Sequence, residues 1–331
     1  MHLRRTFATL LAVGTLFAAT ACSGSDLSSG ATDPNSSSTP AESSSTSDGA
    51  SEPAAAGGGP VRISGQSFGE AALMASMYEQ LLAAAGYEPT VDLVDSRDGY
   101  MTTFPDSIDV VPEYVGGIVN FLNGRENGDS AKPFETGDGT ELATDGADLL
   151  DGAGISLLDV SDATDTNAFF VTQDYSDSND VTALSDLEGE SVTLAAAPDC
   201  EGRLDCEGGL SDAYGIDITE VLPLGYASDQ TYQSVIDGES QLGETSTTDG
   251  TLESQGLVVL DDDKQIQPAQ NLVPAVSSAF LAAHPDVADV LNPLMAALTT
   301  DKLTELNARI SVNREKPEDV AADFLASEGL L

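Results

Sequence analysis

The stretch "IDVVPEYVGGIVNFL", Ile108–Leu122, indicates the fold class of this chain. Ile108 to Val111 is a short apolar run of the kind that forms a buried strand, and "GGIVNFL" after it has a helical pattern. Tyr114 stands alone at the break. In α/β proteins ligands bind beyond the carboxyl ends of the strands, so Tyr114 is a candidate site residue. The alternative is a half-buried loop tyrosine.

The preceding segment, residues 61–96, has the same alternation of strand and helix. Its pattern predicts a strand at 61–64, a helix, and a strand at 90–94. Ser67 and Glu70 match a capping box at the start of the helix, and Gly86 ends it. Together these elements predict an α/β arrangement with a mostly parallel sheet.

The rest of the chain falls into two parts. "NAFFVTQDY" and "SVTLAAA" are typical of buried strands and open a further run of alternating elements, whereas residues 271–331 are almost wholly helical in pattern. After the N-terminal segment roughly 270 residues remain, which is enough for two lobes. No glycine-rich phosphate loop follows a strand.

The N-terminus has the features of an export signal. In "MHLRRTFATLLAVGTLFAATAC" two arginines precede an apolar run, and small residues precede Cys22, as in a bacterial lipobox. We expect residues 1–21 to be a lipoprotein signal peptide and Cys22 to be lipidated, with residues 22–59 as a disordered Ser/Gly/Pro-rich tether. This places the protein at the extracellular face of the membrane. An ordinary signal peptide with a chance cysteine is the alternative, and the export route, Sec or twin-arginine, stays open.

The two remaining cysteines, Cys200 and Cys206, would both lie outside the cytoplasm. That environment predicts a disulfide between them. The competing interpretation is a metal site, but the chain's two histidines, His2 and His284, do not neighbour them to supply the other ligands. We therefore predict no metal.

The charge balance limits the possible partners. The chain has 12 basic and 56 acidic side chains, a formal net charge of −44. Nucleic acid and anionic lipid headgroups are poor partners for such a surface. A solvated acidic coat explains most of this charge. Its field favours cationic ligands over anionic ones.

Four segments in order resemble the substrate-binding proteins of glycine betaine, choline and carnitine ABC importers. They are "ISGQSFGEAALMASMYEQLLAAAGY", "SIDVVPEYVGGIVNFL", "GLVVLDDDKQIQPAQNLVPAV" and the C-terminal segment from "HPDVADVLNPL" to "DFLASEGLL". The resemblance implies a two-lobed, periplasmic-binding-protein-like (type II) α/β fold, with a ligand cleft between lobes joined by two crossovers. The implied lobes are 60–165 plus 271–331, and 166–270. It also implies a monomer that uses no cofactor and works with ABC permease and ATPase subunits.

Members of that family hold a quaternary ammonium group in a cage of tyrosines, because such a cation has no N–H donor and binds best over aromatic faces. The first cage tyrosine matches Tyr114. The other three positions match Asn167 in "DTNA", Ser246 in "STTDG" and Gln270 in "QPAQNL", all of them polar here. Gly117 stands where the family often has a hydroxyl residue. The resemblance therefore supports the receptor role more strongly than the quaternary ammonium ligand.

Asp165 in "DTNA" and Thr247 in "STTDG" belong to the matched motifs, and three further residues complete the candidate site. Gln66 and Ser67 precede the first predicted helix, where a polar or anionic ligand end can meet N–H groups, although Ser67 as a simple cap is the alternative. Arg203 matches a family arginine that approaches the cleft, and a surface arginine balancing nearby acids is the alternative. The predicted ligand-binding residues are Gln66, Ser67, Tyr114, Gly117, Asp165, Asn167, Arg203, Ser246, Thr247 and Gln270.

These observations predict a lipid-anchored solute-binding protein that captures a small zwitterionic or cationic solute and delivers it to an ABC permease. One alternative keeps this role with a more polar, non-quaternary ligand, amino-acid-like or ergothioneine-like. Another is a ligand sensor without transport. An enzyme is not predicted, since the sequence shows no metal-ligand cluster and its two histidines are His2, in the signal, and His284.

Overall fold

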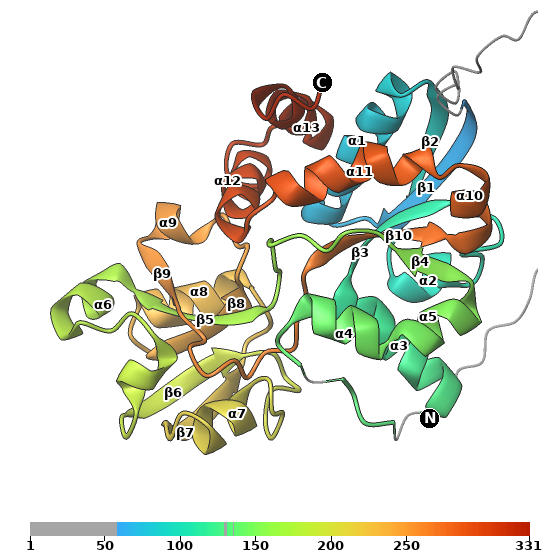
Figure 1. The fold of residues 1–331 in the computed structure, drawn as a ribbon. Helices are drawn as coiled ribbons and strands as arrows, with labels where there is room; N and C mark the ends of the chain where they lie inside the picture. Colours follow the sequence, from blue (N-terminus) through green and yellow to red (C-terminus); the bar gives the residue numbers. More distant parts are fainter. Residues whose placement is uncertain (1–57, 129–130, 135) are drawn as a thin grey trace, which may run out of the picture. The chain divides into compact units, whose positions relative to one another are not determined.

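Residues 108–122 pass directly from strand to helix, as the sequence predicts. The structure is a computed structural model that describes residues 58–128, 131–134 and 136–331 (Figure 1). Strand β3, Val110–Tyr114, is buried along its whole length and continues without a loop into helix α3, Val115–Asn127. Val110 and Val111 point into different apolar clusters, because successive side chains of a strand lie on opposite faces of its sheet.

The first sheet surrounds β3. Its strands are β1 (Gly59–Gln66), β2 (Tyr87–Val94), β3, β4 (Ile155–Leu157) and β10 (Leu272–Ser277), in the order β2-β1-β3-β10-β4. β1 pairs in parallel with β2 and β3, whereas β10 is antiparallel to β3 and β4. The three strands for which the sequence predicted a mostly parallel sheet, β1, β2 and β3, are parallel to one another, but the complete sheet is not mostly parallel. The sheet is mixed, since its fourth member arrives from a distant part of the chain.

Helices cover both faces of this sheet (Figure 1). One apolar cluster joins α1 and α11–α13 to the strands, and another joins α2–α5 to them. The helices are α1 (Gly69–Ala84), α2 (Arg97–Met101), α3, α4 (Gly139–Asp145), α5 (Ala147–Ala153), α10 (Ser278–Ala283), α11 (Asp286–Ala297), α12 (Thr300–Ser311) and α13 (Pro317–Ser327).

The second sheet is built entirely from the intervening segment. Its strands are β5 (Asn167–Thr172), β6 (Ser191–Ala196), β7 (Asp217–Pro223), β8 (Leu242–Ser246) and β9 (Leu257–Leu260), in the order β7-β6-β8-β5-β9. β6 is parallel to β7 and β8, and β5 is antiparallel to β8 and β9. The accompanying helices are α6 (Gln173–Asn179), the 3-10 helix η1 (Leu184–Leu187), α7 (Glu207–Asp212), α8 (Asp229–Ile236) and α9 (Leu252–Gln255).

The chain crosses between the sheets twice, after β4 and after β9. The two crossing segments pair with each other: Asp165 N donates to Gln270 O at 3.1 Å, and Thr164 forms a β-bridge with Asn271. This pairing fixes Asp165 at the junction of the two sheets. The boundaries 60–165 plus 271–331 and 166–270 stay a prediction, and the signal peptide and Cys22 lie outside the described residues.

The start of α1 differs from the expected capping box. The N-cap residue is Phe68, which makes no side-chain cap. Ser67 Oγ instead donates to Asp95 Oδ1 at 3.4 Å, and Glu70 is bound by side chains from β3 and α12. The local pattern was misleading because these tertiary partners satisfy Glu70. In the described part of the chain, no helix has both the length and the apolar character needed to cross a membrane.

Candidate functional site

A cavity of about 460 Å³ lies beside the paired crossing segments. It is bounded by the start of α1, the first crossing, the loop after β7, the end of β8 and one face of α12. Its lining residues are Phe68, Gly69, Glu70, Asp165, Tyr226, Ala227, Tyr232, Ser246, Thr248, Asp249, Gly250, Thr251, Asn307, Ile310 and Ser311. A hollow of about 650 Å³ beside α4 and β4 is larger, but no aromatic side chain lines it.

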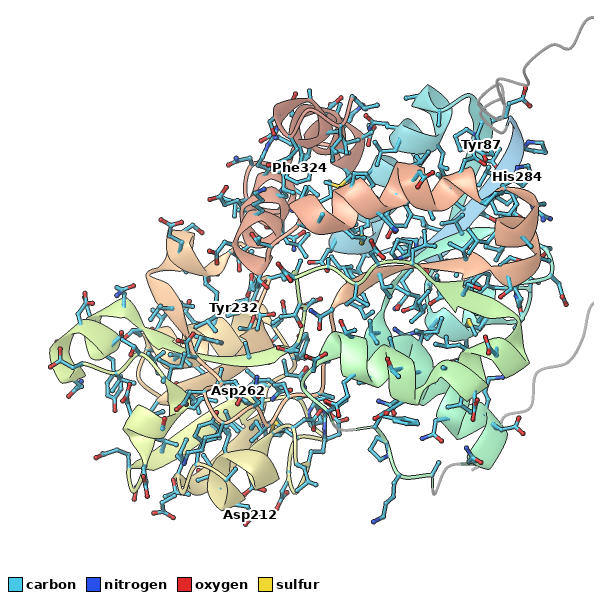
Figure 2. All side chains as sticks on the ribbon, in the orientation of Figure 1. Tyr87, Asp212, Tyr232, Asp262, His284 and Phe324 are labelled. Carbon is cyan, nitrogen blue, oxygen red and sulfur yellow. A yellow bond between two sulfur atoms is a disulfide. The ribbon has the colours of Figure 1, made fainter. Side chains whose placement is uncertain are left out.

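Aromatic rings form part of the cavity wall. Phe68 precedes α1, beside the first sheet, and Tyr226 follows β7 of the second sheet. Their exposed fractions are 41% and 44%. Phe68 stacks on Tyr114, with ring centroids 6.4 Å apart and planes inclined by 18°. Tyr232, labelled in Figure 2, is buried and donates its hydroxyl to Asp249 Oδ2 at 2.7 Å. Exposed large rings in a cavity are typical of a binding surface, since a ligand would cover them.

Glu70 is a buried carboxylate in this wall. Its Oε1 accepts from the Tyr114 hydroxyl at 2.5 Å, and its Oε2 accepts from Asn307 Nδ2 at 2.6 Å. Asn307 Nδ2 also donates to Thr248 O, which links α12 to the loop after β8. Burial raises the pKa of Glu70, and these hydrogen bonds oppose the rise. Glu70 is thus held in one position at the cavity surface.

Asp165 is the second carboxylate. Its Oδ1 is buried and has no hydrogen-bond partner among the described residues. Burial raises the pKa of Asp165 to about 7, the charge of Glu70 adds to the rise, and hydrogen bonds from Ser246 and Thr248 oppose it. Asp249 differs, because its oxygens accept from Tyr232, Thr245 and Thr251. Asp165 is the lining acid with unused acceptor capacity.

The cavity therefore combines aromatic walls with carboxylates. No lysine, arginine or histidine is among the lining residues of this described cavity. Aromatic faces and carboxylates both attract cations, the first through the ring quadrupole and the second through formal charge. The arrangement is suited to holding a small organic cation.

The family model for the substrate-binding domain of ABC-type glycine betaine transport systems matches residues 59–327. The chain belongs to this family. Its glycine-betaine-binding relative from Pseudomonas aeruginosa is 27% identical over 285 residues, covering 82% of this chain and 88% of the relative. The glycine betaine-binding protein YehZ of Escherichia coli is 28% identical over 287 residues, covering 82% of this chain and 91% of YehZ.

Solved structures of this family share the fold. Apo YehZ from Escherichia coli superposes with a TM-score of 0.68 at 23% identity, covering 82% of this chain and 99% of that structure. A glycine betaine/carnitine/choline ABC transporter protein gives 0.71 at 21% identity, covering 82% of this chain and 99% of that structure. The two-lobed, type II periplasmic-binding-protein fold expected from the sequence is confirmed.

The family's cage positions occupy different surroundings in this member. Tyr114 lies behind Phe68, and its hydroxyl orients Glu70. Ser246 lines the cavity as a polar residue. Asn167 Nδ2 donates to Asp205 Oδ2 at 3.3 Å, and Gln270 Oε1 accepts from Gly117 N at 2.9 Å. Ser246 is thus the only one of these four among the cavity's lining residues.

The other predicted residues have mostly structural contacts. Gln66 ends β1 and Ser67 contacts Asp95. A Cβ at Gly117 would lie 2.3 Å from Arg97 Nη2, so the hydroxyl residue common in the family would require the Arg97 guanidinium to shift. Thr247 Oγ1 donates to Thr164 O at 2.9 Å and so ties β8 to the first crossing.

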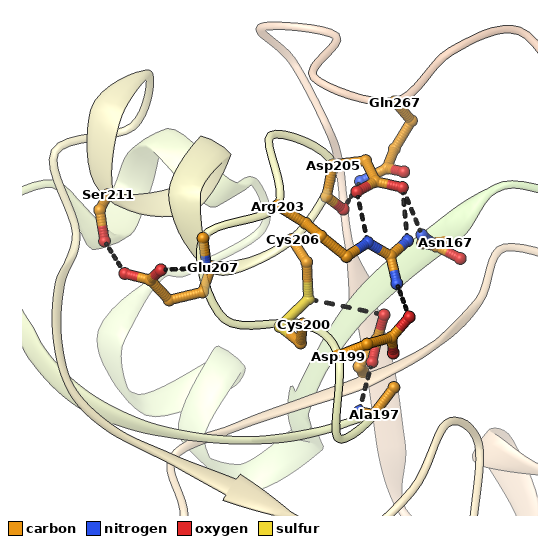
Figure 3. Close-up of a disulfide and its surroundings, with 12 residues drawn as sticks. Asn167, Ala197, Asp199, Cys200, Arg203, Asp205, Cys206, Glu207, Ser211 and Gln267 are labelled. Atoms are coloured by element: carbon orange, nitrogen blue, oxygen red, sulfur yellow. Dashed lines mark hydrogen bonds and ion pairs between the residues drawn. A yellow bond between two sulfur atoms is a disulfide. The ribbon is translucent and has the colours of Figure 1, made fainter. Parts of the chain in front are cut away.

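Arg203 lies in the disulfide loop (Figure 3). Cys200 and Cys206 form the predicted disulfide, with Cα atoms 5.3 Å apart. With Glu244 they are the group that has metal-ligand spacing in the described chain, but their sulfurs are bonded to each other. The Arg203 guanidinium donates to Asp205 and Asp199, both of which are also drawn in Figure 3. Its charge is already neutralised.

Sequence reasoning missed the residues that give the cavity its chemistry: Phe68, Glu70, Tyr226 and Asn307. Glu70 was assigned to a helix cap, and Tyr226 lies in a short loop between β7 and α8. The available signal was Phe68 itself, a large ring at the beginning of a helix that follows a buried strand. Such a position lies at the carboxyl edge of the sheet, where ligands bind.

The stability of the ligand-free protein should depend on pH through Asp165. Its pKa is raised from 3.8 to about 7, so the folded protein keeps a proton that the unfolded chain releases. This stabilising contribution is complete below the unfolded pKa and is lost as pH rises toward about 7. The stability of Asp165→Asn relative to wild type should therefore increase from about pH 4 to about pH 7 and change little above that.

Thermal unfolding of the two proteins across this range would measure the difference. Glu70, Asp249 and Tyr226, which face Asp165, are present in both proteins, so the comparison isolates the loss of the Asp165 carboxyl group. A difference that does not change with pH would contradict a raised pKa at Asp165.

Proposed function

We propose that this chain is the lipid-anchored extracellular receptor of an ABC importer, and that its cavity captures a quaternary ammonium solute and presents it to the permease. The observation that carries the proposal is the pairing of two exposed rings, Phe68 and Tyr226, with two carboxylates, Glu70 and Asp165, in one cavity. Membership of the glycine betaine family supports the transport role.

The physical basis is the chemistry of the ammonium group. A quaternary nitrogen has no N–H to donate, so rings and negative charge are its best partners, at about 0.5–2 kcal/mol per ring. The rings missing from the family's cage positions are replaced by Phe68 and Tyr226, which come from other places in the sequence. This replacement supports a quaternary ammonium ligand despite Asn167, Ser246 and Gln270.

Calorimetric titration of the exported domain with choline, glycine betaine, carnitine, proline and ergothioneine would test the ligand class. We expect saturable heat from at least one trimethylammonium compound and none from proline. Ergothioneine, named above with the non-quaternary alternatives, itself carries a trimethylammonium group, so its binding would not discriminate between the two ligand classes. Absence of heat from every trimethylammonium compound would contradict the proposal.

Transport separates an importer from a sensor. Uptake of a radiolabelled ligand should depend on the chain together with its ABC permease and ATPase. If uptake persists unchanged when the gene is deleted while ligand still binds the purified protein, the sensor alternative would be favoured.

Lipid anchoring at Cys22 is proposed from the lipobox-like signal. Cys22→Ala should prevent acylation and release most of the protein from the membrane fraction, because no second anchor is predicted. Fractionation with immunoblotting would measure this shift. The same distribution for Cys22→Ala and wild type would show that another feature holds the protein at the membrane.

A further inference from the structure

The charge of the cavity lining bears on whether the ligand is a cation or a zwitterion. Glu70, Asp165 and Asp249 all line the cavity, and no basic side chain does among the described residues. Both carboxylate oxygens of Asp249 already accept hydrogen bonds, from the hydroxyl groups of Tyr232, Thr245 and Thr251. Glu70 and Asp165 are the acids whose charge a ligand would have to balance.

Asp165 also requires a hydrogen-bond donor. Its Oδ1 is buried with no partner in the described chain, although nearly all buried polar atoms in proteins have one. Since Asp165 lines the cavity, a ligand hydroxyl is the group best placed to donate to its carboxylate.

A ligand carboxylate would find no counter-charge here. Arg203 is itself a predicted site residue and Arg97 lies beside Gly117, and both guanidinium groups are engaged. Arg97 makes a two-pronged contact with Glu113, and Arg203 does the same with Asp205. A carboxylate in the cavity would also be repelled by Glu70 and Asp165.

We propose that the cavity selects a monocationic quaternary ammonium alcohol over the zwitterionic betaine with the same trimethylammonium group, and that Asp165 determines this selectivity. Glu70 and the rings attract the ammonium group, and Asp165 accepts from the hydroxyl. The inference rests on the proposed function, because it assigns the charge class of the same ligand. It predicts a preference opposite to that implied by the names of the two glycine-betaine-binding relatives.

Choline and glycine betaine form a matched pair of probes, since they differ only in having a hydroxymethyl group or a carboxylate at the end of the chain. We expect wild type to bind choline at least about tenfold more tightly than glycine betaine in calorimetric titration, the ratio that one favourable charged contact produces. Asp165→Asn should weaken choline binding by about tenfold and leave glycine betaine binding unchanged or improved.

Asp162→Asn is the matched control, because Asp162 is an exposed acid on the same segment and does not line the cavity. It should keep the wild-type preference. Thermal unfolding of ligand-free Asp165→Asn would verify folding, and this variant should be at least as stable as wild type at about pH 8 because it lacks a buried charge.

The outcomes separate the two proposals. Glycine betaine binding as tightly as choline, or a preference that Asp165→Asn does not reduce, would overturn this inference and leave the proposed function intact. Failure of all trimethylammonium compounds to bind wild type would overturn the proposed function and the inference with it.

Discussion

Replacing Phe68 and Tyr226 together with alanine is expected to weaken ligand binding about 30-fold. Each ring contributes about 1 kcal/mol of cation–π attraction if it is partly desolvated by the ligand, so the loss of both corresponds to about 2 kcal/mol. Because the two side chains are 41% and 44% exposed, their removal should change protein stability little. Calorimetric titration with the tightest-binding trimethylammonium compound would measure the change.

Ring-preserving variants are the control for this prediction. Phe68→Tyr and Tyr226→Phe keep an aromatic face in the cavity and should stay within about threefold of wild-type affinity. If the double alanine variant also stays within that range, the two rings do not bind the ligand. If Tyr226→Phe alone reproduces the loss, the hydroxyl of Tyr226 rather than its ring is the ligand contact.

Glu113→Ala is expected to lower the free energy of unfolding by about 3 kcal/mol, the effect of leaving a buried ionic partner unpaired. Glu113 is 1% exposed and accepts from Arg97 Nε at 2.9 Å and Arg97 Nη2 at 3.0 Å. It also accepts from the Tyr100 hydroxyl and from the backbone N–H of Tyr114. The Arg97 side chain is 24% exposed, so water can partly solvate its charge after Glu113 is removed. The expected loss of unfolding free energy is therefore at the lower end of the range for buried ion pairs. Urea unfolding followed by circular dichroism would measure the loss.

A double variant distinguishes an unpaired charge from a packing defect. Arg97→Met combined with Glu113→Leu removes both charges, so it should lose less stability than Glu113→Ala alone. Equal losses would mean that packing around Glu113 dominates. A loss below about 1 kcal/mol for Glu113→Ala would contradict a structural role for this ion pair.

Local patterns succeeded where one segment contains all the relevant information. The passage from β3 to α3 was readable because an apolar run meets a helical run within a few residues. The Cys200–Cys206 disulfide was readable because the export signal predicts a location outside the cytoplasm, where a pair of cysteines forms a disulfide. The capping box failed, since Glu70 was bound by groups distant in sequence that no local pattern contains.

The sequence by itself determined the family, the α/β fold class and the strand end at which a site would lie. Only the tertiary structure decided which side chains line the cavity. Glu70 accepts a hydrogen bond from Asn307, which lies 237 positions away in the chain. Tyr114, expected to contact the ligand directly, lies behind Phe68. Burial and the nearby charge of Glu70 raise the pKa of Asp165. Periodicity records which face of an element is buried, whereas ligand chemistry depends on distant segments that only folding brings together.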